Sequence, residues 1–199
     1  MKSRIVDIVT VILGVAGGLA LVAMLTWTGM LQAEDKPADR AITLAEGKMV
    51  FEAPKEWTRK QPKSRIIDHE FAVAGAGEGK EDGRFTVMGA GGGIEANIAR
   101  WQGQFTQSDG TQTTEKTKTQ KLVIKDTTVH YVDITGDYRD QAGPFNPAPA
   151  VVRPNYRMLA AIVDDEKLGT YFLKFYGPKD LVTANEKSFQ EMLNSLKKK

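Results

Sequence analysis

Hydrophobic and polar residues alternate along most of the chain that follows residue 47. A period of two is typical of strands with one buried face, and it predicts about seven strands. They are expected at residues 48–53, 65–74, 84–89, 121–125, 128–135, 156–163 and 170–176. In the last of these, apolar residues occupy both faces, with Phe172, Lys174 and Tyr176 on one of them. This strand is therefore expected to lie in the middle of its sheet, with both faces partly covered.

A polar segment joins the last two predicted strands. It runs from Asp164 through Asp165 to Gly169, and acidic residues followed by glycine are typical of a hairpin loop. The two strands are therefore expected to be antiparallel neighbours, with the acidic residues at a solvated tip. A calcium site is not predicted, because the spacing of oxygen ligands in an EF-hand is missing.

Two helices interrupt the strand pattern. At residues 94–105 the residues Ile94, Ile98, Trp101 and Phe105 recur at helical spacing, so Trp101 is expected in the core. A second helix is predicted to begin at a capping box, Thr183-x-x-Glu186, and to end before a lysine triplet that complements its dipole. The order of these elements predicts an α+β fold, with a mostly antiparallel central sheet covered by helices in an α/β/α sandwich.

The amino terminus differs from the rest of the chain. Lys2 and Arg4 precede a stretch without charges at residues 8–31, and Leu31-Gln32-Ala33 follows as a cleavage motif. Residues 1–33 are predicted to be a signal peptide or, because the apolar run could span a bilayer, an uncleaved membrane anchor. Both alternatives place the remainder outside the cytoplasm, as a periplasmic, secreted or membrane-anchored protein. Residues 34–46 are predicted to be a linker, and residues 47–199 a single domain.

Composition narrows the function classes. The chain has 27 Lys and Arg against 25 Asp and Glu, so it has no global field that would attract nucleic acid. It has no cysteine, which excludes disulfides, thiol nucleophiles and cysteine-based metal centres.

A glycine-rich turn precedes the first helix and is one candidate site. The turn contains Gly91, Gly92 and Gly93, and the helix then carries Asn97 and Arg100. The spacing fits neither a dinucleotide fingerprint nor a P-loop. The turn is therefore either a structural turn that requires unusual dihedral angles or a place where a small ligand or anion binds at the helix N-terminus.

Catalytic spacing is not found in the sequence. His69 and His130 lie in strand patterns without metal-ligand partners, and no serine occupies a nucleophile elbow. We therefore expect no catalytic residue, no metal and no cofactor. The alternative is an exported hydrolase or isomerase that uses one of these histidines with a carboxylate.

A proline-rich stretch at residues 138–155 is the second candidate site. It is predicted to be a long loop, and its apolar and basic side chains could anchor a protein partner. The candidate residues are Arg139, Phe145, Val151 and Arg153. The alternative is a loop that packs its apolar residues against the sheet.

Three segments together resemble the PsbP-like superfamily, which contains an extrinsic subunit of photosystem II and a eukaryotic Ran-binding protein. They are Phe51-Glu52-Ala53-Pro54-Lys55-Glu56-Trp57, the segment GGGIEANIARWQGQF, and the end of the chain with Gly177-Pro178 and the last helix. The second segment is similar to one in exported bacterial members. The resemblance covers about residues 47–197 and implies a central antiparallel sheet between helices, as well as a binding or assembly role. It supplies no ion-binding residue.

These observations lead to an expected function. The chain is predicted to be a non-catalytic binding or accessory module of the cell envelope with a protein partner and no nucleic acid. It would work through the proline-rich segment or the glycine-rich turn. The alternatives are the exported hydrolase or isomerase, which is a different class of protein, and a small-anion binder at that turn.

Overall fold

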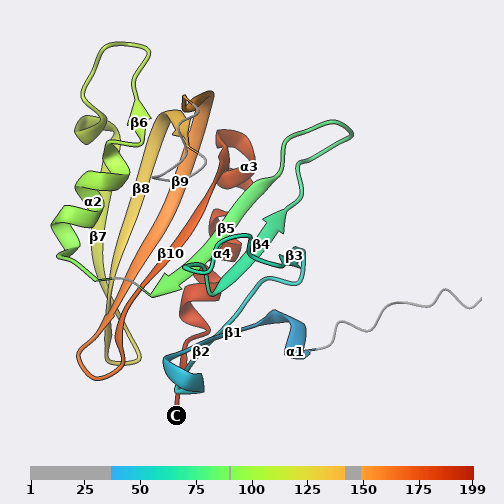
Figure 1. The fold of residues 1–199 in the computed structure, drawn as a ribbon, viewed down its shortest axis with the longest axis vertical. Coiled ribbons are helices and arrows are strands. Elements are labelled where there is room, and N and C mark those ends of the chain that lie inside the picture. Colours follow the sequence, from blue (N-terminus) through green and yellow to red (C-terminus); the bar gives the residue numbers. More distant parts are fainter. Residues whose placement is uncertain (1–36, 90, 142–148) are drawn as a thin grey trace, which may run out of the picture. The chain divides into compact units, whose positions relative to one another are not determined.

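The computed structural model describes residues 37–89, 91–141 and 149–199. An eight-stranded antiparallel sheet forms the centre of this part, and a three-stranded sheet lies at one end of it (Figure 1). The expected α+β fold, with a central antiparallel sheet and helices packed on it, is confirmed. The predicted signal peptide or anchor at residues 1–33 lies outside the described residues.

The large sheet has the strand order β3-β4-β5-β10-β9-β8-β6, and β7 also pairs with β8. Its strands are β3 (Trp57–Lys60), β4 (His69–Val73), β5 (Gly83–Gly89), β6 (Phe105–Thr106), β7 (Thr117–Ile124), β8 (Thr127–Asp140), β9 (Val151–Asp165) and β10 (Gly169–Pro178). The predicted hairpin between β9 and β10 is confirmed, because Asp165 pairs with Gly169.

The remaining elements form the small sheet and the helices. The small sheet contains β1 (Ala41–Leu44), β2 (Met49–Glu52) and β11 (Lys197–Lys198). The helices are α1 (Pro37–Arg40), η1 (Ala45–Gly47), α2 (Ile94–Gln102), η2 (Thr113–Lys116), α3 (Lys179–Ala184) and α4 (Glu186–Asn194). None of the described helices is long and apolar enough to cross a membrane.

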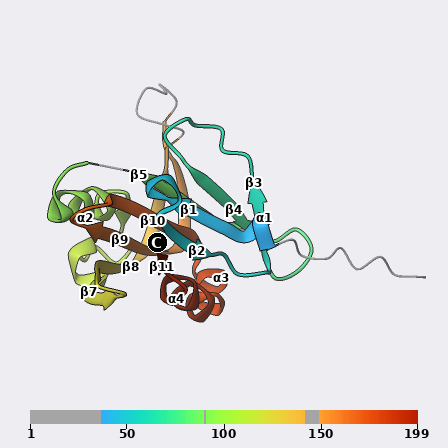
Figure 2. The ribbon, with the colours of Figure 1, turned by 90° about the horizontal axis from the view of Figure 1, so that it is seen from below.

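Strand β10 separates two hydrophobic cores. Leu173 and Phe175 belong to one core, which also contains Phe189 of α4. Phe172 faces the other way, into a core with Trp101 of α2, where the two rings meet edge to face at 5.4 Å. The helices α2 and α4 therefore cover opposite faces of the sheet, as Figure 2 shows from below. Both the central position of β10 and the core position of Trp101 are as predicted.

The fold begins earlier than predicted. Residues 34–46 were expected to form a linker, but Ile42 and Leu44 of β1 are buried and belong to the core that α4 covers. Strand β1 pairs with β2 in register, Ile42 opposite Phe51. The burial of these two apolar side chains stabilises the folded position of this segment.

The carboxyl end also differs from the prediction. The predicted capping box is wrong: the Thr183 hydroxyl lies at the end of α3 and donates to the Lys179 carbonyl oxygen at 2.7 Å. Helix α4 begins after Asn185 without a side-chain cap. Lys197 and Lys198 form β11 beside β2 rather than extending from the end of a helix.

Candidate functional site

The glycine-rich turn leads from β5 into α2 and is held together by Asn97. The Asn97 side chain is 5% exposed, and its Nδ2 donates to the Gly93 carbonyl oxygen at 2.9 Å. Gly92 has a φ of 100°, and a Cβ there would lie 3.3 Å from the same Nδ2. The turn thus requires glycine for its backbone, and the Asn97 amide group stabilises it. At Gly91 and Gly93 no atom lies within 4 Å of an added Cβ, so this side of the turn is open.

Arg100 does not lie at the turn. It follows Gly93 by seven residues, which is about 10 Å along a helix that rises about 1.5 Å per residue. Its guanidinium carbon lies 6.0 Å from the centre of the Phe172 ring. The structure therefore separates Arg100 from the three glycines of the turn and places it near Phe172 of β10.

Lys174 of β10 is a second charged group near Arg100. It shares a face with Phe172 and Tyr176, and it lies opposite Thr86 and Ala160 in the neighbouring strands. Its Nζ donates to Gln104 Oε1 at 3.0 Å and lies 5.2 Å from the centre of the Tyr176 ring. Among the described residues no carboxylate forms an ion pair with it.

The charge of this amine is destabilised by its surroundings. Burial, followed by the positive charges of Arg100 and Arg84, lowers the pKa of Lys174 to about 7. An amine in this environment is stabilised by any anion that approaches it. The arrangement therefore favours the binding of a carboxylate or a phosphate group.

Arg84 of β5 already has an anionic partner. Its Nε and Nη2 each donate to a different oxygen of Glu70 at 2.9 Å, and its Nη1 donates to the Tyr176 hydroxyl at 2.8 Å. The hydrogen bonds that Arg84 donates to Glu70 raise the pKa of Arg84, so its guanidinium stays charged. Because Arg84 and Glu70 are paired, Lys174 and Arg100 are the two cations of this group without an ion-pair partner among the described residues. We call Lys174, Arg100, Arg84 and Gln104 the cationic cluster.

The sequence indicated this cluster only in part. The sequence predicts Arg100 as a candidate ligand residue, but for Lys174 it predicts only a position on one face of a strand. The sequence does place a lysine between Phe172 and Tyr176 on the same partly buried strand face, and this unusual position could have indicated a functional lysine. Arg84 could not be joined to it without the pairing of β5 with β10, and Gln104 could not be joined without the contact between the segment after α2 and β10.

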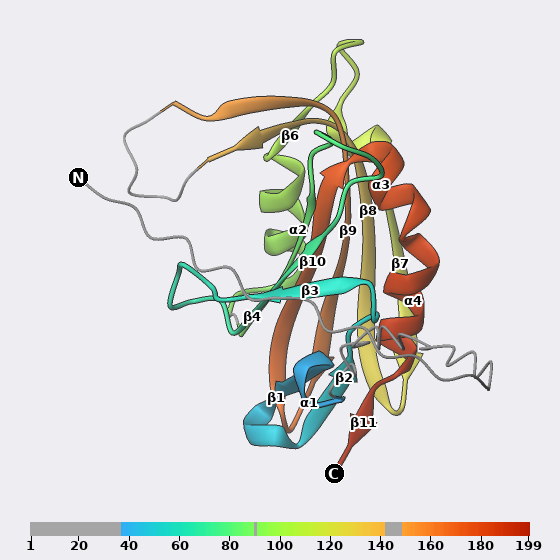
Figure 3. The same ribbon diagram turned by 90° about the vertical axis from the view of Figure 1, so that its right-hand side faces the viewer.

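The proline-rich segment is not a continuous loop. Its ends belong to β8 and β9, which extend beyond β10 as a two-stranded arm, visible at the upper left of Figure 3. Arg139 lies opposite Val152, and Arg153 forms ion pairs with Asp140 at 3.3 Å and Glu81 at 3.1 Å.

The outer surface of the arm is apolar in part. Val151 and Val152 are 54% and 58% exposed. We refer to residues 137–140 and 151–155 as the arm. Phe145, the remaining candidate, lies outside the described residues.

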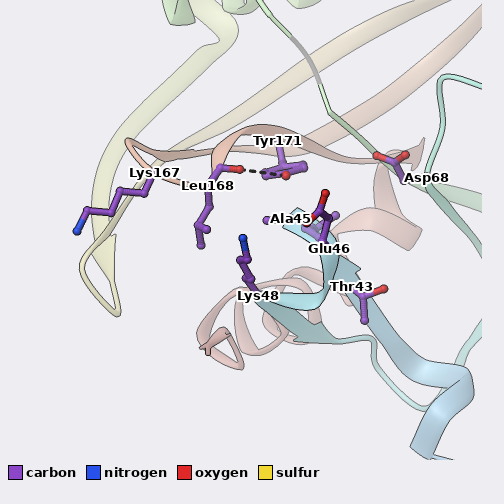
Figure 4. Close-up of a pocket in the computed structure, with 9 residues that line it drawn as sticks. Thr43, Ala45, Glu46, Lys48, Asp68, Lys167, Leu168 and Tyr171 are labelled. Carbon is purple, nitrogen blue, oxygen red and sulfur yellow. Dashed lines mark hydrogen bonds between the residues drawn. The ribbon is translucent and has the colours of Figure 1, made fainter.

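The largest described cavity, about 500 Å³, lies between η1 and the β9–β10 hairpin (Figure 4). Lys48, Lys167, Glu46 and Asp68 line it, so its charges are mixed in sign. The Tyr171 hydroxyl, which also lines the cavity, is occupied because it donates to the Leu168 carbonyl oxygen at 3.1 Å. The cavity therefore has no group that would select one class of ligand.

Asp68 links this cavity to the glycine-rich turn. Its Oδ2 accepts a hydrogen bond from the Gly89 backbone N–H at 3.0 Å. The carboxylate therefore helps to hold the end of β5, where the turn begins.

The histidines have structural partners. His69 Nε2 lies 2.9 Å from the Thr43 carbonyl oxygen and Nδ1 lies 3.0 Å from Arg59 Nη1. In the tautomer that satisfies both bonds, Nε2 donates to Thr43 and Nδ1 accepts from Arg59. His130 lies on β8 between Lys121 and Ile162 of the adjacent strands. In the described ranges, no three His, Asp or Glu side chains are grouped as a metal site would require.

Comparisons with known proteins concern the fold. No protein-family model matches the chain, and no curated protein is significantly similar to it in sequence. Among solved structures, it is similar to the cyanobacterial PsbP protein CyanoP from Synechocystis sp. PCC 6803. The TM-score is 0.47 at 10% identity, over 80% of this chain and 91% of the other.

A second similar structure is the Saccharomyces cerevisiae Ran-binding protein Mog1p. The TM-score is 0.42 at 8% identity, over 81% of this chain and 96% of the other. Both proteins are of the kinds named in the resemblance expected from the sequence, and at 10% and 8% identity the similarity is one of fold alone.

Proposed function

We propose that the domain is an exported, non-catalytic binding or accessory module of the cell envelope. Its partner is a protein, and the cationic cluster recognises a carboxylate or phosphate group of that partner. The amino-terminal sequence supports export through a signal peptide or membrane anchor at residues 1–33.

One observation carries the proposal. Lys174 is partly buried and forms no ion pair with a carboxylate among the described residues. It lies near two guanidinium groups, whose positive charges lower its pKa. An isolated cation of this kind costs folding free energy unless it is neutralised. An anionic ligand would offset that cost, and the Arg100 side chain is near enough to contribute a second positive charge.

The test is a titration of the purified domain with sodium sulfate at pH 6, followed by NMR. We expect Lys174→Met to weaken sulfate binding by about tenfold to a hundredfold, the value of a charge-assisted hydrogen bond in fold-change. Arg100→Gln is expected to weaken it less, because the guanidinium is exposed. The matched control is Lys118→Met, since Lys118 is an exposed strand lysine on the opposite face.

Two results would contradict the proposal. One is equal sulfate affinity in Lys174→Met and the wild-type domain. The other is equal loss of affinity in the Lys118→Met control, which would indicate diffuse attraction to the surface rather than a site.

A further inference from the structure

A second cavity lies on the opposite face of the large sheet from the cationic cluster. It has a volume of about 290 Å³ and opens between the edge strand β7 and α4. Leu122 and Ile124 of β7 and Leu193 of α4 form apolar walls, and Tyr131 of β8 lines it as well. Tyr131 belongs to the core that α4 covers, whereas Lys174 faces the core that α2 covers.

The lining of this cavity carries no charge. Its three remaining residues are the amides Gln120, Gln190 and Asn194. The other described cavities each include lysine, and two of them include glutamate. A charged ligand would lose its hydration here without gaining a counter-ion, so the lining favours a neutral one.

Tyr131 brings a hydrogen-bond donor that lacks an acceptor. The side chain is 9% exposed, and its hydroxyl is buried with no hydrogen-bond partner among the described residues. Burial, together with the charge of Glu186, raises the pKa of Tyr131 to about 12, so at neutral pH the hydroxyl carries its proton.

Gln190, an exposed residue of α4, lies beside this hydroxyl. Its amide acts as a donor that lowers the pKa of Tyr131, so it does not accept the hydroxyl proton, and the hydroxyl has no acceptor among the described residues. An exposed glutamine side chain can turn toward solvent and open a path from the cavity to the hydroxyl. An unpaired buried donor costs free energy, which an incoming acceptor would recover.

We propose that the β7–α4 cavity binds a small neutral molecule with an apolar body and one acceptor oxygen, such as a ketone or ester carbonyl. The apolar body contacts Leu122, Ile124 and Leu193, and the oxygen accepts the hydrogen bond of Tyr131. The volume lies at the lower end of ligand pockets, which begin at about 300 Å³, so the ligand has few heavy atoms. This site is independent of the proposed function of the cationic cluster.

The test compares two probes of similar shape, cyclohexanone and methylcyclohexane, by NMR of labelled Leu and Ile methyl groups in the full domain. We expect both probes to shift the methyl signals of Leu122, Ile124 and Leu193, and cyclohexanone to bind roughly threefold to tenfold more tightly, as one neutral hydrogen bond provides. In Tyr131→Phe this preference should vanish, while methylcyclohexane still binds.

The matched control is Tyr171→Phe, which removes a tyrosine hydroxyl already bonded to Leu168. It should leave the preference for cyclohexanone unchanged. The variant Tyr131→Phe keeps the ring in the core, and the removal of an unsatisfied hydroxyl should raise its Tm, which confirms that it folds. The proposal is wrong if the methyl groups of the cavity do not shift, or if Tyr131→Phe retains the preference.

Discussion

At the scale of single residues, the most informative group is the Lys174 amine. Its pKa is lowered to about 7, so its ability to attract an anion depends on pH within the physiological range. Below pH 7 the amine is protonated and can bind an anion. Above pH 7 the free domain loses this proton, and binding must first restore it.

This linkage gives a quantitative expectation. Sulfate does not change its charge between pH 6 and pH 9, so a change in affinity reports on the protein. We expect the Kd for sulfate to rise by up to about tenfold per pH unit above pH 7. In Lys174→Arg, whose side chain stays protonated, the dependence should be nearly flat. A wild-type affinity that is equally flat would contradict the assignment of the site to Lys174.

The sequence was most informative about residues whose role is to be buried. Trp101 follows from helical spacing, and Phe172 from alternation in a strand. The cationic cluster was not predicted as a unit, because its members come from α2, the segment after α2, β5 and β10, and only the pairing of β5 with β10 brings Arg84 beside Tyr176. The spacing of residues along the sequence does not show which side chains of different elements come into contact.

At the scale of elements, Asp165 joins the β9–β10 hairpin to the end of the chain. The prediction of a solvated tip is wrong for this residue, which is 8% exposed. Its carboxylate accepts hydrogen bonds from Lys198 Nζ at 2.6 Å, the Thr127 hydroxyl at 3.1 Å, and the backbone N–H groups of Lys167 and Leu168 at 3.0 Å each. These bonds lower the pKa of Asp165 to about 2.

The lowered pKa makes stability sensitive to acid. The ionised carboxylate stabilises the fold above its unfolded pKa of about 4, and this contribution is lost as the pH falls through about 2. We expect Asp165→Asn to lower the free energy of unfolding at pH 7 by about 2 kcal/mol and to flatten the acid limb of the stability curve. Urea denaturation at pH 2 to 7 measures both effects. Asp164→Asn, one residue away and less buried, serves as a control.

Gly136 sets the shape of β8. It lies where the register with β9 shifts, and it has a φ of 151°. A Cβ there would approach the Thr106 carbonyl oxygen to 2.7 Å and Gln107 Nε2 to 2.5 Å. The bulge lets the short strand β6 pair with β8 beyond the shift, where Phe105 lies opposite Tyr138.

Substitution of this glycine should therefore be costly. We expect Gly136→Ala to destabilise the domain by about 2 kcal/mol, because both the backbone angle and the close contacts oppose a side chain. Gly91→Ala, where no atom lies within 4 Å, should change stability little. Thermal unfolding of the two variants decides, and equal Tm values would contradict this role of Gly136.

Strand prediction worked for most strands of the large sheet and failed for four of the shortest strands. The strands β2, β4, β5, β7, β8, β9 and β10 all overlap predicted ones, because hydrophobic and polar residues alternate along them. In contrast, β1, β3, β6 and β11 have four residues or fewer and were missed. Such strands exist because of their partners: Ile42 and Leu44 become core residues only when β2 lies beside them.

At the scale of the whole domain, we propose that the arm is a surface for a protein partner. Val151 and Val152 expose apolar side chains on strands that have passed the end of β10. Exposed valines on a strand can contribute to an interface, although single exposed apolar residues are common. This role of the arm can be tested separately from the cationic cluster.

The experiment is crosslinking and affinity capture from the native envelope. We expect Val152→Asp to abolish capture of the partner while leaving the Tm within a degree or two, because the side chain is exposed. Val123→Asp is the control, since Val123 is 71% exposed on β7, away from the arm. If both variants capture the partner equally, the arm is not part of the interface.

The alternation of β10 has a consequence for how this domain can change. Successive side chains of the strand enter different cores, so the sheet separates the residues packed on one of its faces from those packed on the other. Residues of the cationic cluster on one face share few contacts with the β7–α4 cavity on the other face. The effects of substitutions at the two places on the free energy of unfolding should therefore add. Each face could therefore be altered by mutation without disturbing the other, and a single domain of this size could acquire or lose one specificity while keeping the second.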